Sequence, residues 1–200
     1  PLADGSVLVS DDLAGAVYRV TYKPCVSHHA RHSCAGRKRT PHPTRWTHTM
    51  QLRSDNFENN QPIPATFTFG KRADPFALSD NRSPHLAWKN APSATRSFVL
   101  TCIDPDVPSR GDDVNQPGRT VPADLPRVEF VHWLMANIPA ECGELAAGAC
   151  SDGITPRGKR EPFGPPGSVQ GVNDFTGWFG GDADMGGEYL GYDGPCPPWN

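Results

Sequence analysis

The sequence predicts a mainly β protein, and three observations support this. Residues 128–138 (VEFVHWLMANI) alternate with the two-residue period of a strand, and residues 97–103 (SFVLTCI) form an apolar run of strand length. No stretch of ten or more residues shows a helical pattern, whereas 22 prolines and 20 glycines among 200 residues supply turns and long loops. Strands joined by such loops are typical of a β-sandwich.

Residues 128–138 form the strongest predicted strand. Because side chains of a strand point alternately to opposite faces, one face is predicted to carry Val128, Phe130, His132, Leu134, Ala136 and Ile138. The other face is predicted to carry Glu129, Val131, Trp133, Met135 and Asn137. A shorter strand is predicted over residues 66–69, and the strand at 97–103 is predicted to end at Asp104-Pro105.

The chain divides into three predicted segments. Residues 1–23 show a strand–turn–strand pattern, typical of a terminal hairpin. Residues 24–49 contain no acidic residue, are rich in histidine and basic residues, and are predicted to be a disordered linker. Residues 50–200 carry the β pattern and form the main predicted domain. Met50 followed by QLRSDNF resembles a translation start, so two neighbouring coding regions read as one chain would explain the division.

The linker segment offers one alternative, a zinc site. Thiolate and imidazole groups are the ligands that zinc prefers, and those available here are Cys25, His28, His29, His32 and Cys34. The spacing differs from that of a standard zinc finger, and ligands this close together leave no room for a supporting core. We therefore favour the linker.

Charge is distributed unevenly along the chain. Residues 1–54 carry 8 Lys/Arg and 3 Asp/Glu, whereas residues 55–200 carry 11 and 19, within a formal net charge of −3. An acidic body does not bind nucleic acid by neutralising phosphates, so no nucleic-acid partner is expected. No apolar run approaches the roughly 20 residues of a membrane span, and no signal peptide is recognisable. Six irregularly spaced cysteines are expected to be reduced thiols in a cytoplasmic protein.

Two motifs place candidate functional residues on the predicted strands. In residues 104–108 (DPDVP), the prolines fix φ and make the turn rigid, so that a carboxylate points in a fixed direction. His132 lies in the middle of the strand at 128–138, where a buried imidazole needs a hydrogen-bond partner. We expect Asp104 to be that partner and to hold the ring in one tautomer.

A third motif is the stretch 191–198 (GYDGPCPP), which is predicted to be a stiff loop. Gly194 permits close approach by a ligand, and the prolines offer apolar walls. Each of the three motifs also has a plain structural interpretation. These are an Asp-Pro turn, a histidine of the core and a surface turn.

The order of the motifs resembles that of the phosphatidylethanolamine-binding proteins, above all their bacterial branch, often called Raf-kinase-inhibitor-like. The matching order is N-x-S-P-x-L-x-W (81–88), AP (91–92), SFVLT (97–101), DPDVPSR (104–110), HW (132–133) and GYDGPCPP (191–198). This resemblance covers nearly all of residues 50–200. Separately, residues 4–22 (DGSVLVSDDLAGAVYRVTY) resemble the closing strands of a β-propeller of the sorbosone dehydrogenase type, over one hairpin only.

The family resemblance implies a fold and a pocket. The fold is a two-sheet antiparallel β-sandwich, and the pocket at one edge accepts phosphate-like groups, including phospholipid head groups. Asp104 and His132 match the pocket carboxylate and histidine, and Phe130 matches an aromatic wall. The pocket lip matches Gly194, Pro195, Cys196 and Pro197. The family pattern continues into an H-R-Y-like strand that this sequence lacks. We therefore expect a sandwich incomplete at the C-terminus, with apolar side chains left exposed.

These observations predict binding and not catalysis, without a cofactor or a metal. The expected ligand is a small anion or a phospholipid head group, held by imidazoles and backbone N–H groups. Its binding should weaken as the pH rises from about 5 to 8. One alternative is a protein-interaction module of the kinase-inhibitor type, recognised through loop 108–127. Another is a hydrolase, which would use Cys196 with His132 as a thiolate–imidazole pair. A metal-dependent version would use Asp104, Asp106 and His132 as ligands.

Overall fold

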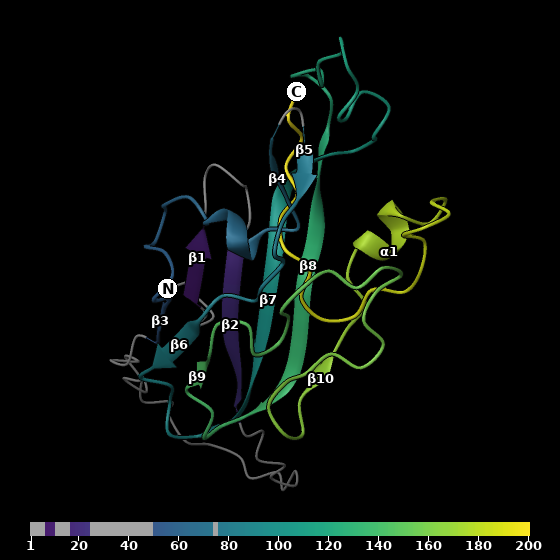
Figure 1. Ribbon diagram of the computed structural model, residues 1–200. Helices are drawn as coiled ribbons and strands as arrows, with labels where there is room; N and C mark the ends of the chain where they lie inside the picture. Colours follow the sequence, from purple (N-terminus) through teal and green to yellow (C-terminus); the bar gives the residue numbers. More distant parts are fainter. Residues whose placement is uncertain (1–6, 11–16, 25–49, 74–75) are drawn as a thin grey trace, which may run out of the picture.

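A computed structural model describes residues 7–10, 17–24, 50–73 and 76–200 of the chain, and it is mainly β, as predicted (Figure 1). In chain order the strands are β1 (Val7–Ser10), β2 (Val17–Pro24), β3 (Gln51–Arg53), β4 (Gly70–Arg72), β5 (Phe76–Leu78), β6 (Leu86–Lys89), β7 (Thr95–Pro108), β8 (Arg127–Pro139), β9 (Glu144–Leu145) and β10 (Val169–Gln170). A 3-10 turn, η1 (Ala65–Phe67), and a short helix, α1 (Phe175–Trp178), complete the elements of the described residues.

Two antiparallel sheets pack face to face. The larger sheet has the order β1-β2-β7-β8-β10, and the smaller one has the order β3-β6-β9. Apolar side chains from both sheets form one cluster, called here the closed core, whose buried members are Met50, Ile63, Phe67, Leu86, Trp88, Phe98, Leu100, Cys102, Trp133, Met135, Ile138, Leu145, Cys150 and Tyr192. The two-sheet antiparallel sandwich is therefore confirmed. The strand predicted at residues 66–69 is wrong, because η1 occupies its first half.

The expectation that apolar side chains are left exposed by an incomplete C-terminal side stays a prediction, and Val128 and Leu134 of β8 are 44% and 37% exposed. The apolar side chains of β7 that belong to the closed core are covered, since Phe98, Leu100 and Cys102 are 2%, 0% and 0% exposed. The smaller sheet covers their face, and β2 pairs antiparallel along the neighbouring edge, from Val17 opposite Ile103 to Pro24 opposite Thr95.

The strand–turn–strand pattern of the N-terminal segment corresponds to β1 and β2, which pair antiparallel from Val7 opposite Val20 to Ser10 opposite Val17. Because β2 also pairs with β7, the larger sheet crosses the predicted boundary at residue 50. The division into three segments stays a prediction. The predicted linker and the alternative zinc site fall on residues 25–49, outside the described residues.

The long β7–β8 hairpin contains three irregularities, and these overturn two details of the predicted strands. One shift of the register lies between Cys102 and Ile103. Because Cys102 faces Trp133 and Ile103 faces Val131, this shift leaves His132 as an extra residue on β8. A β-bulge of this kind turns successive side chains to the same side. Buried members of β8 therefore include His132, Trp133 and Met135, whereas Leu134 is exposed. The strict two-face division predicted for residues 128–138 is wrong.

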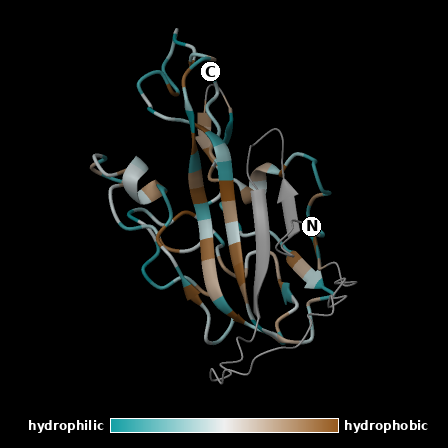
Figure 2. Cartoon of the chain, turned by 180° about the vertical axis from the view of Figure 1, so that it is seen from behind, coloured by the Kyte–Doolittle hydropathy of each residue, from teal (hydrophilic) through white to brown (hydrophobic). Residues whose placement is uncertain are grey.

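A second irregularity lies at the Asp-Pro motif. Asp104 faces Phe130 and Val107 faces Val128, so Pro105 and Asp106 bulge out of the ladder. The strand was predicted to end at Asp104-Pro105, but it continues to Pro108. Bulges accommodate a proline within a strand because the missing N–H is not needed there. Figure 2 shows apolar residues along both strands of this hairpin, viewed from behind.

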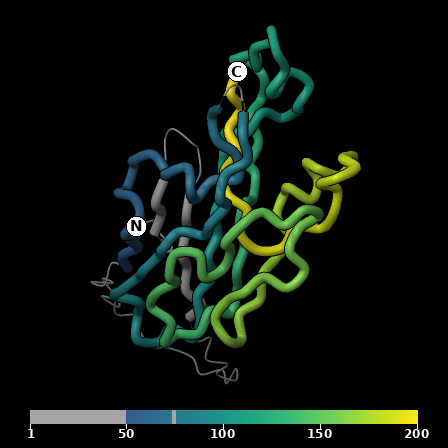
Figure 3. Tube along the Cα trace, viewed as in Figure 1, coloured from purple at the N-terminus to yellow at the C-terminus, as the bar shows by residue number. Residues whose placement is uncertain are grey.

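The C-terminal segment returns to the start of the domain. It runs beside the β4–β5 hairpin, as the yellow and blue tubes show in Figure 3. The backbone N–H groups of Phe69 and Gly70 donate to the carbonyl of Pro195, over 2.9 and 3.4 Å. In the described part of the chain, no helix has the length and apolar character needed to cross a membrane.

Candidate functional site

A cavity of about 480 Å³ opens beside the end of the β7–β8 hairpin that carries Asp104 and Phe130. Its walls come from these two strands, the β4–β5 hairpin, the 109–126 loop, the segment around α1 and the C-terminal residues. The lining residues are Phe69, Phe76, Leu78, Asp104, Asp106, Val107, Pro108, Val114, Asn115, Val121, Arg127, Phe130, His132, Phe175, Trp178, Phe179, Met185, Cys196, Pro197, Pro198 and Asn200. The cavity therefore combines a broad apolar surface with a few polar groups, which is typical of a small-molecule site.

His132 lies in the wall of this cavity because the bulge in β8 turns it there together with Phe130. The imidazole is 3% exposed, and its Nδ1 lies 3.0 Å from the backbone carbonyl oxygen of Asp193. Its Nε2 is buried and has no hydrogen-bond partner among the described residues. Burial lowers the pKa of His132 to about 4, against the smaller opposing effect of the Asp193 carbonyl. The ring is therefore neutral at physiological pH.

Asp104 lines the same cavity but does not hold the histidine. It is 8% exposed, and its Oδ1 accepts a hydrogen bond from the backbone N–H of Asp106 over 2.8 Å. The expectation that Asp104 fixes the tautomer of His132 is wrong, because a backbone carbonyl takes that place. The bulge at Pro105 and Asp106 instead closes a small turn around the Asp104 carboxylate.

Five of the seven predicted site residues line the cavity, namely Asp104, Phe130, His132, Cys196 and Pro197. Gly194 and Pro195 do not. Gly194 packs against the backbone of residues 67 and 68, and its N–H donates to the Asn81 side chain over 2.8 Å. Its lack of a side chain serves this close packing inside the protein, not the approach of a ligand. Pro195 fixes the lip through its carbonyl, which accepts from Phe69.

A buried polar cluster anchors the lip. Asp193 is 0% exposed, and its carboxylate accepts hydrogen bonds from Lys159 (2.6 Å), Asn81 (2.8 Å) and Asn173 (2.9 Å). The backbone of Asp193 makes two hydrogen bonds with His132. Its N–H donates to the His132 carbonyl over 3.1 Å, and its carbonyl oxygen lies 3.0 Å from Nδ1 of the imidazole. The cluster therefore holds the imidazole and the lip in one arrangement. Sequence motifs did not identify it, because its members lie far apart in the chain.

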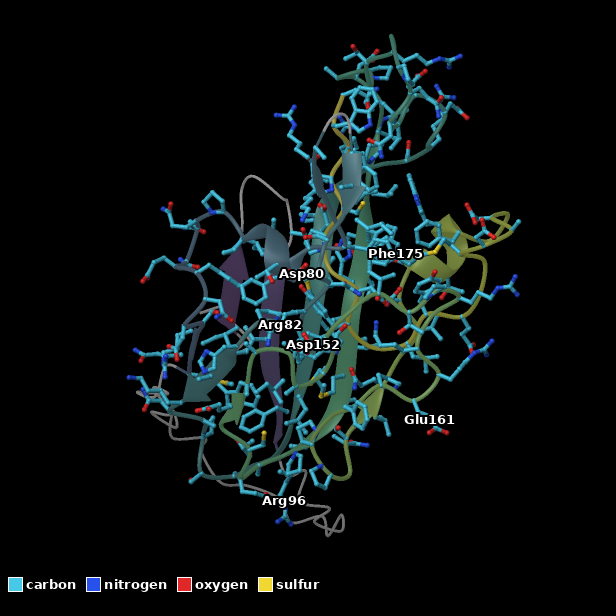
Figure 4. The ribbon with its side chains drawn as sticks, in the orientation of Figure 1. Asp80, Arg82, Arg96, Asp152, Glu161 and Phe175 are labelled. Carbon is cyan, nitrogen blue, oxygen red and sulfur yellow. The ribbon has the colours of Figure 1, made fainter. Side chains whose placement is uncertain are left out.

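Aromatic residues around α1 form the wall that adjoins His132 and Phe130. Phe175 stacks on Phe69 with ring centroids 4.5 Å apart and meets Phe130 edge to face at 5.1 Å. Phe175 begins α1 and lies on the side of this helix that is turned toward β8, as Figure 4 shows. Asp174 holds the helix against β8 through two hydrogen bonds. Its backbone N–H donates to the carbonyl of Val131, and its carboxylate accepts from the N–H of Val131. The buried residues here, called the cavity cluster, are Phe69, Phe130, Phe175 and Tyr189.

The sequence analysis did not identify this aromatic wall. Its signal was the spacing of Phe175, Trp178 and Phe179, which follows one helical turn within a glycine-rich stretch.

Neither hydrolase alternative finds support in this geometry. Burial raises the pKa of the Cys196 thiol to about 11, so the thiol is protonated at neutral pH and is a poor nucleophile. Among the described residues there is no group of three or more His, Cys, Asp or Glu side chains placed to hold a metal ion, so Asp104, Asp106 and His132 do not form one.

Comparisons with known proteins match most of the chain. A family model described as phosphatidylethanolamine-binding protein matches residues 53–200. The UPF0098 protein YbhB of Escherichia coli is 31% identical over 150 residues, which are 74% of this chain and 69% of YbhB. A UPF0098 protein of Methanothermobacter thermautotrophicus is 29% identical over 149 residues, or 74% of this chain and 68% of that protein.

A crystal structure of E. coli YbcL, described as a new member of the mammalian PEBP family, is 27% identical and covers 74% of this chain and 67% of its own, with a TM-score of 0.49. The matched range begins at residue 53, so the resemblance of residues 4–22 to a β-propeller stays a prediction. A family model that spans most of the chain, together with the relative YbhB, shows that the chain belongs to the phosphatidylethanolamine-binding protein family.

Proposed function

We propose that this protein binds a small ligand that carries a phosphate-type group, with that group at His132 and an apolar part against the aromatic wall. The observation that carries the proposal is His132 itself, a residue of the cavity wall whose buried Nε2 has no partner among the described residues. A buried polar atom without a partner costs about 1–3 kcal/mol, which a ligand recovers.

The description of the matching family supports the choice of ligand, because it names phosphatidylethanolamine, a lipid whose head group carries a phosphate. The cavity suits an amphipathic molecule. Its polar groups gather near β7 and β8, and Phe175, Trp178 and Phe179 lie in the aromatic wall. Among the residues that line the cavity, Cys196 is a buried, protonated thiol and not an activated nucleophile, so we favour binding without turnover.

The proposal is tested by titrating the isotope-labelled protein with methyl phosphate and following backbone and aromatic NMR signals. We expect saturable shifts at residues of the cavity, and a roughly tenfold or greater loss of affinity in His132→Phe, since a hydrogen bond to a charged group contributes about 1.5–3 kcal/mol. His85→Phe is the matched control, because His85 is also buried (8% exposed) but does not line the cavity. Equal losses in both variants would contradict the proposal.

A regulatory role through a protein partner is the second candidate, and one observation favours it. The 109–126 loop forms part of the cavity wall through Val114, Asn115 and Val121. Asn115 also exchanges hydrogen bonds with the backbone of Trp199 and the side chain of Asn200, over 3.0 and 2.9 Å. A ligand in the cavity would therefore contact the same loop that faces solvent. Replacement of residues 116–120, which do not line the cavity, by a short Gly/Ser linker should weaken binding of any partner while methyl phosphate still binds.

Three of the described cysteines support the proposed cytoplasmic setting. Cys142, Cys150 and Cys196 are free thiols. Unpaired cysteines of this kind are maintained in reducing compartments. Counting thiols in the native protein purified without a reductant checks this, and loss of free thiols from these three positions would contradict it.

A further inference from the structure

The position of the proton on His132 follows from its neighbours. Nδ1 faces the carbonyl oxygen of Asp193 at 3.0 Å, and a carbonyl oxygen only accepts hydrogen bonds. Nδ1 therefore carries the proton of the neutral ring, and Nε2 presents a lone pair. Nε2 is the ring atom without a partner among the described residues. The cavity thus offers a hydrogen-bond acceptor at this point, and its ligand must bring a donor.

The charged residues of the cavity also favour a ligand group that brings a hydrogen-bond donor. Two carboxylates of β7, Asp104 and Asp106, line the cavity, and Asp104 is buried. Arg127 of β8 is the only Lys or Arg among the residues that line the described cavity, and its Nε lies 3.6 Å from Asp106. A fully ionised phosphate with two negative charges would therefore meet the lone pair of Nε2, which repels it, in a cavity lined by two carboxylic side chains and one arginine among the described residues.

The remaining charged groups near the imidazole are already paired. Lys159 is bound to the Asp193 carboxylate at 2.6 Å, and the Asp174 carboxylate accepts from the backbone N–H of Val131 at 2.7 Å. The thiol of Cys196 is protonated, because burial raises its pKa to about 11. None of these groups supplies a proton to Nε2 of His132, so the proton of this hydrogen bond has to arrive with the ligand.

We propose that the cavity selects the protonated, singly charged form of a phosphate group, whose P–O–H donates a hydrogen bond to Nε2 of His132. This inference rests on the proposed function and adds to it the protonation state that the site recognises. It also predicts discrimination against sulfate esters, which have the same tetrahedral shape but no proton to donate. The pH dependence of binding then belongs to the ligand. The pKa of His132, lowered by burial to about 4, keeps the ring neutral from pH 5 to 8.

The experiment is a calorimetric titration of the full chain with methyl phosphate and with methyl sulfate, at half-unit steps between about pH 5 and 8. The second pKa of a phosphate monoester lies near 6, so the singly charged form falls roughly a hundredfold over this range. We expect the affinity for methyl phosphate to fall by a similar factor. Methyl sulfate carries one negative charge throughout and is the matched control; we expect it to bind at least tenfold more weakly than methyl phosphate at pH 5.

Three results would overturn the inference, and they differ in what else they affect. Equal, pH-independent binding of both esters would remove proton recognition and leave anion binding intact. Binding of methyl sulfate that tightens on acidification would show that a protonated imidazole is the donor, contrary to the geometry. No binding of either ester at any pH would overturn the proposed function itself, and the inference with it.

Discussion

The closed core and the cavity cluster are built from the same kinds of residue, yet one is sealed and the other is open. In the closed core, Trp133 and Tyr192 are both 0% exposed and meet edge to face with ring centroids 5.1 Å apart. In the cavity cluster, Phe130 and Phe175 meet in the same way at 5.1 Å, but both line a cavity of about 480 Å³. Ring geometry therefore does not distinguish the two regions.

What differs is the covering layer. Two sheets pack on either side of the closed core, and sheets packed face to face leave few voids. The cavity cluster is covered by the four-residue helix α1, by loops and by the C-terminal segment, none of which extends over the whole surface. A single bulge in β8 separates the regions, because Trp133 enters the closed core while His132 faces the cavity.

The largest expected effect comes from removing a tryptophan on each side of this division. Trp133→Ala should lower the free energy of unfolding by about 3–5 kcal/mol, because a fully buried ring leaves a void that sheets cannot fill. Trp178→Ala should cost about 1 kcal/mol or less, since Trp178 is 43% exposed. Urea unfolding followed by circular dichroism measures both. Similar losses would show that the cavity wall is as tightly packed as the core.

The polar cluster beneath the lip gives the next effect. Asp193→Asn should lower the free energy of unfolding by roughly 3 kcal/mol, because Lys159, with 14% of its side chain exposed, loses its counter-charge. Glu188→Gln breaks the exposed pair with Arg160 and should change stability by about 0–1 kcal/mol. Equilibrium urea unfolding at one pH compares them. A neutral result for Asp193→Asn would mean that Lys159 finds water or another acceptor.

Acid should weaken the protein through His132. The pKa of this histidine falls from 6.5 in the unfolded chain to about 4 in the folded one, so the unfolded state binds the extra proton first. Its contribution to stability is complete above pH 6.5 and is lost as the pH falls toward 4, by roughly 3 kcal/mol in total. The free energy of unfolding, measured at intervals across this window, should fall less steeply in His132→Phe. Parallel slopes for the two proteins would contradict the assignment.

The sequence predicted which residues lie at the site better than it predicted their hydrogen-bond partners. Asp104 and His132 were predicted from motifs and Phe130 from the family resemblance, and all three line one cavity. The predicted bond between Asp104 and His132 failed, because the partner of Nδ1 is a backbone carbonyl, and every residue carries one. A side-chain pattern has no means of selecting one carbonyl among two hundred.

The strand faces failed for a related reason. A two-residue period assumes a regular ladder, and one extra residue reverses every face that follows it. The bulge at His132 is a property of the pairing between β7 and β8, which the periodicity of β8 alone does not reveal. The aromatic wall was missed because α1 has four residues, so the spacing of its aromatic residues covers a single turn, which is too short to establish a helical period. The sandwich class was within reach because the two longest strands belong to the hairpin that carries the strongest pattern.

The smallest expected loss of stability tests whether the close packing of Gly194 against the backbone of residues 67 and 68 fixes the lip. A Cβ at Gly194 would lie 2.3 Å from the Phe67 carbonyl oxygen, so Gly194→Ala should force the lip outward and cost about 1–3 kcal/mol of stability. Gly177→Ala is the matched control, since a Cβ there meets nothing within 4 Å and alanine favours the helical conformation of α1.

The two alanine variants should also differ in ligand binding. The lip carries Cys196 and Pro197 in the cavity wall, so its displacement should weaken methyl phosphate binding in Gly194→Ala and leave Gly177→Ala unchanged. Urea unfolding and calorimetric titration of both variants measure the two consequences separately. Lost stability with unchanged affinity would mean that the lip moves independently of His132, which is at odds with the backbone bonds that join Asp193 to that histidine.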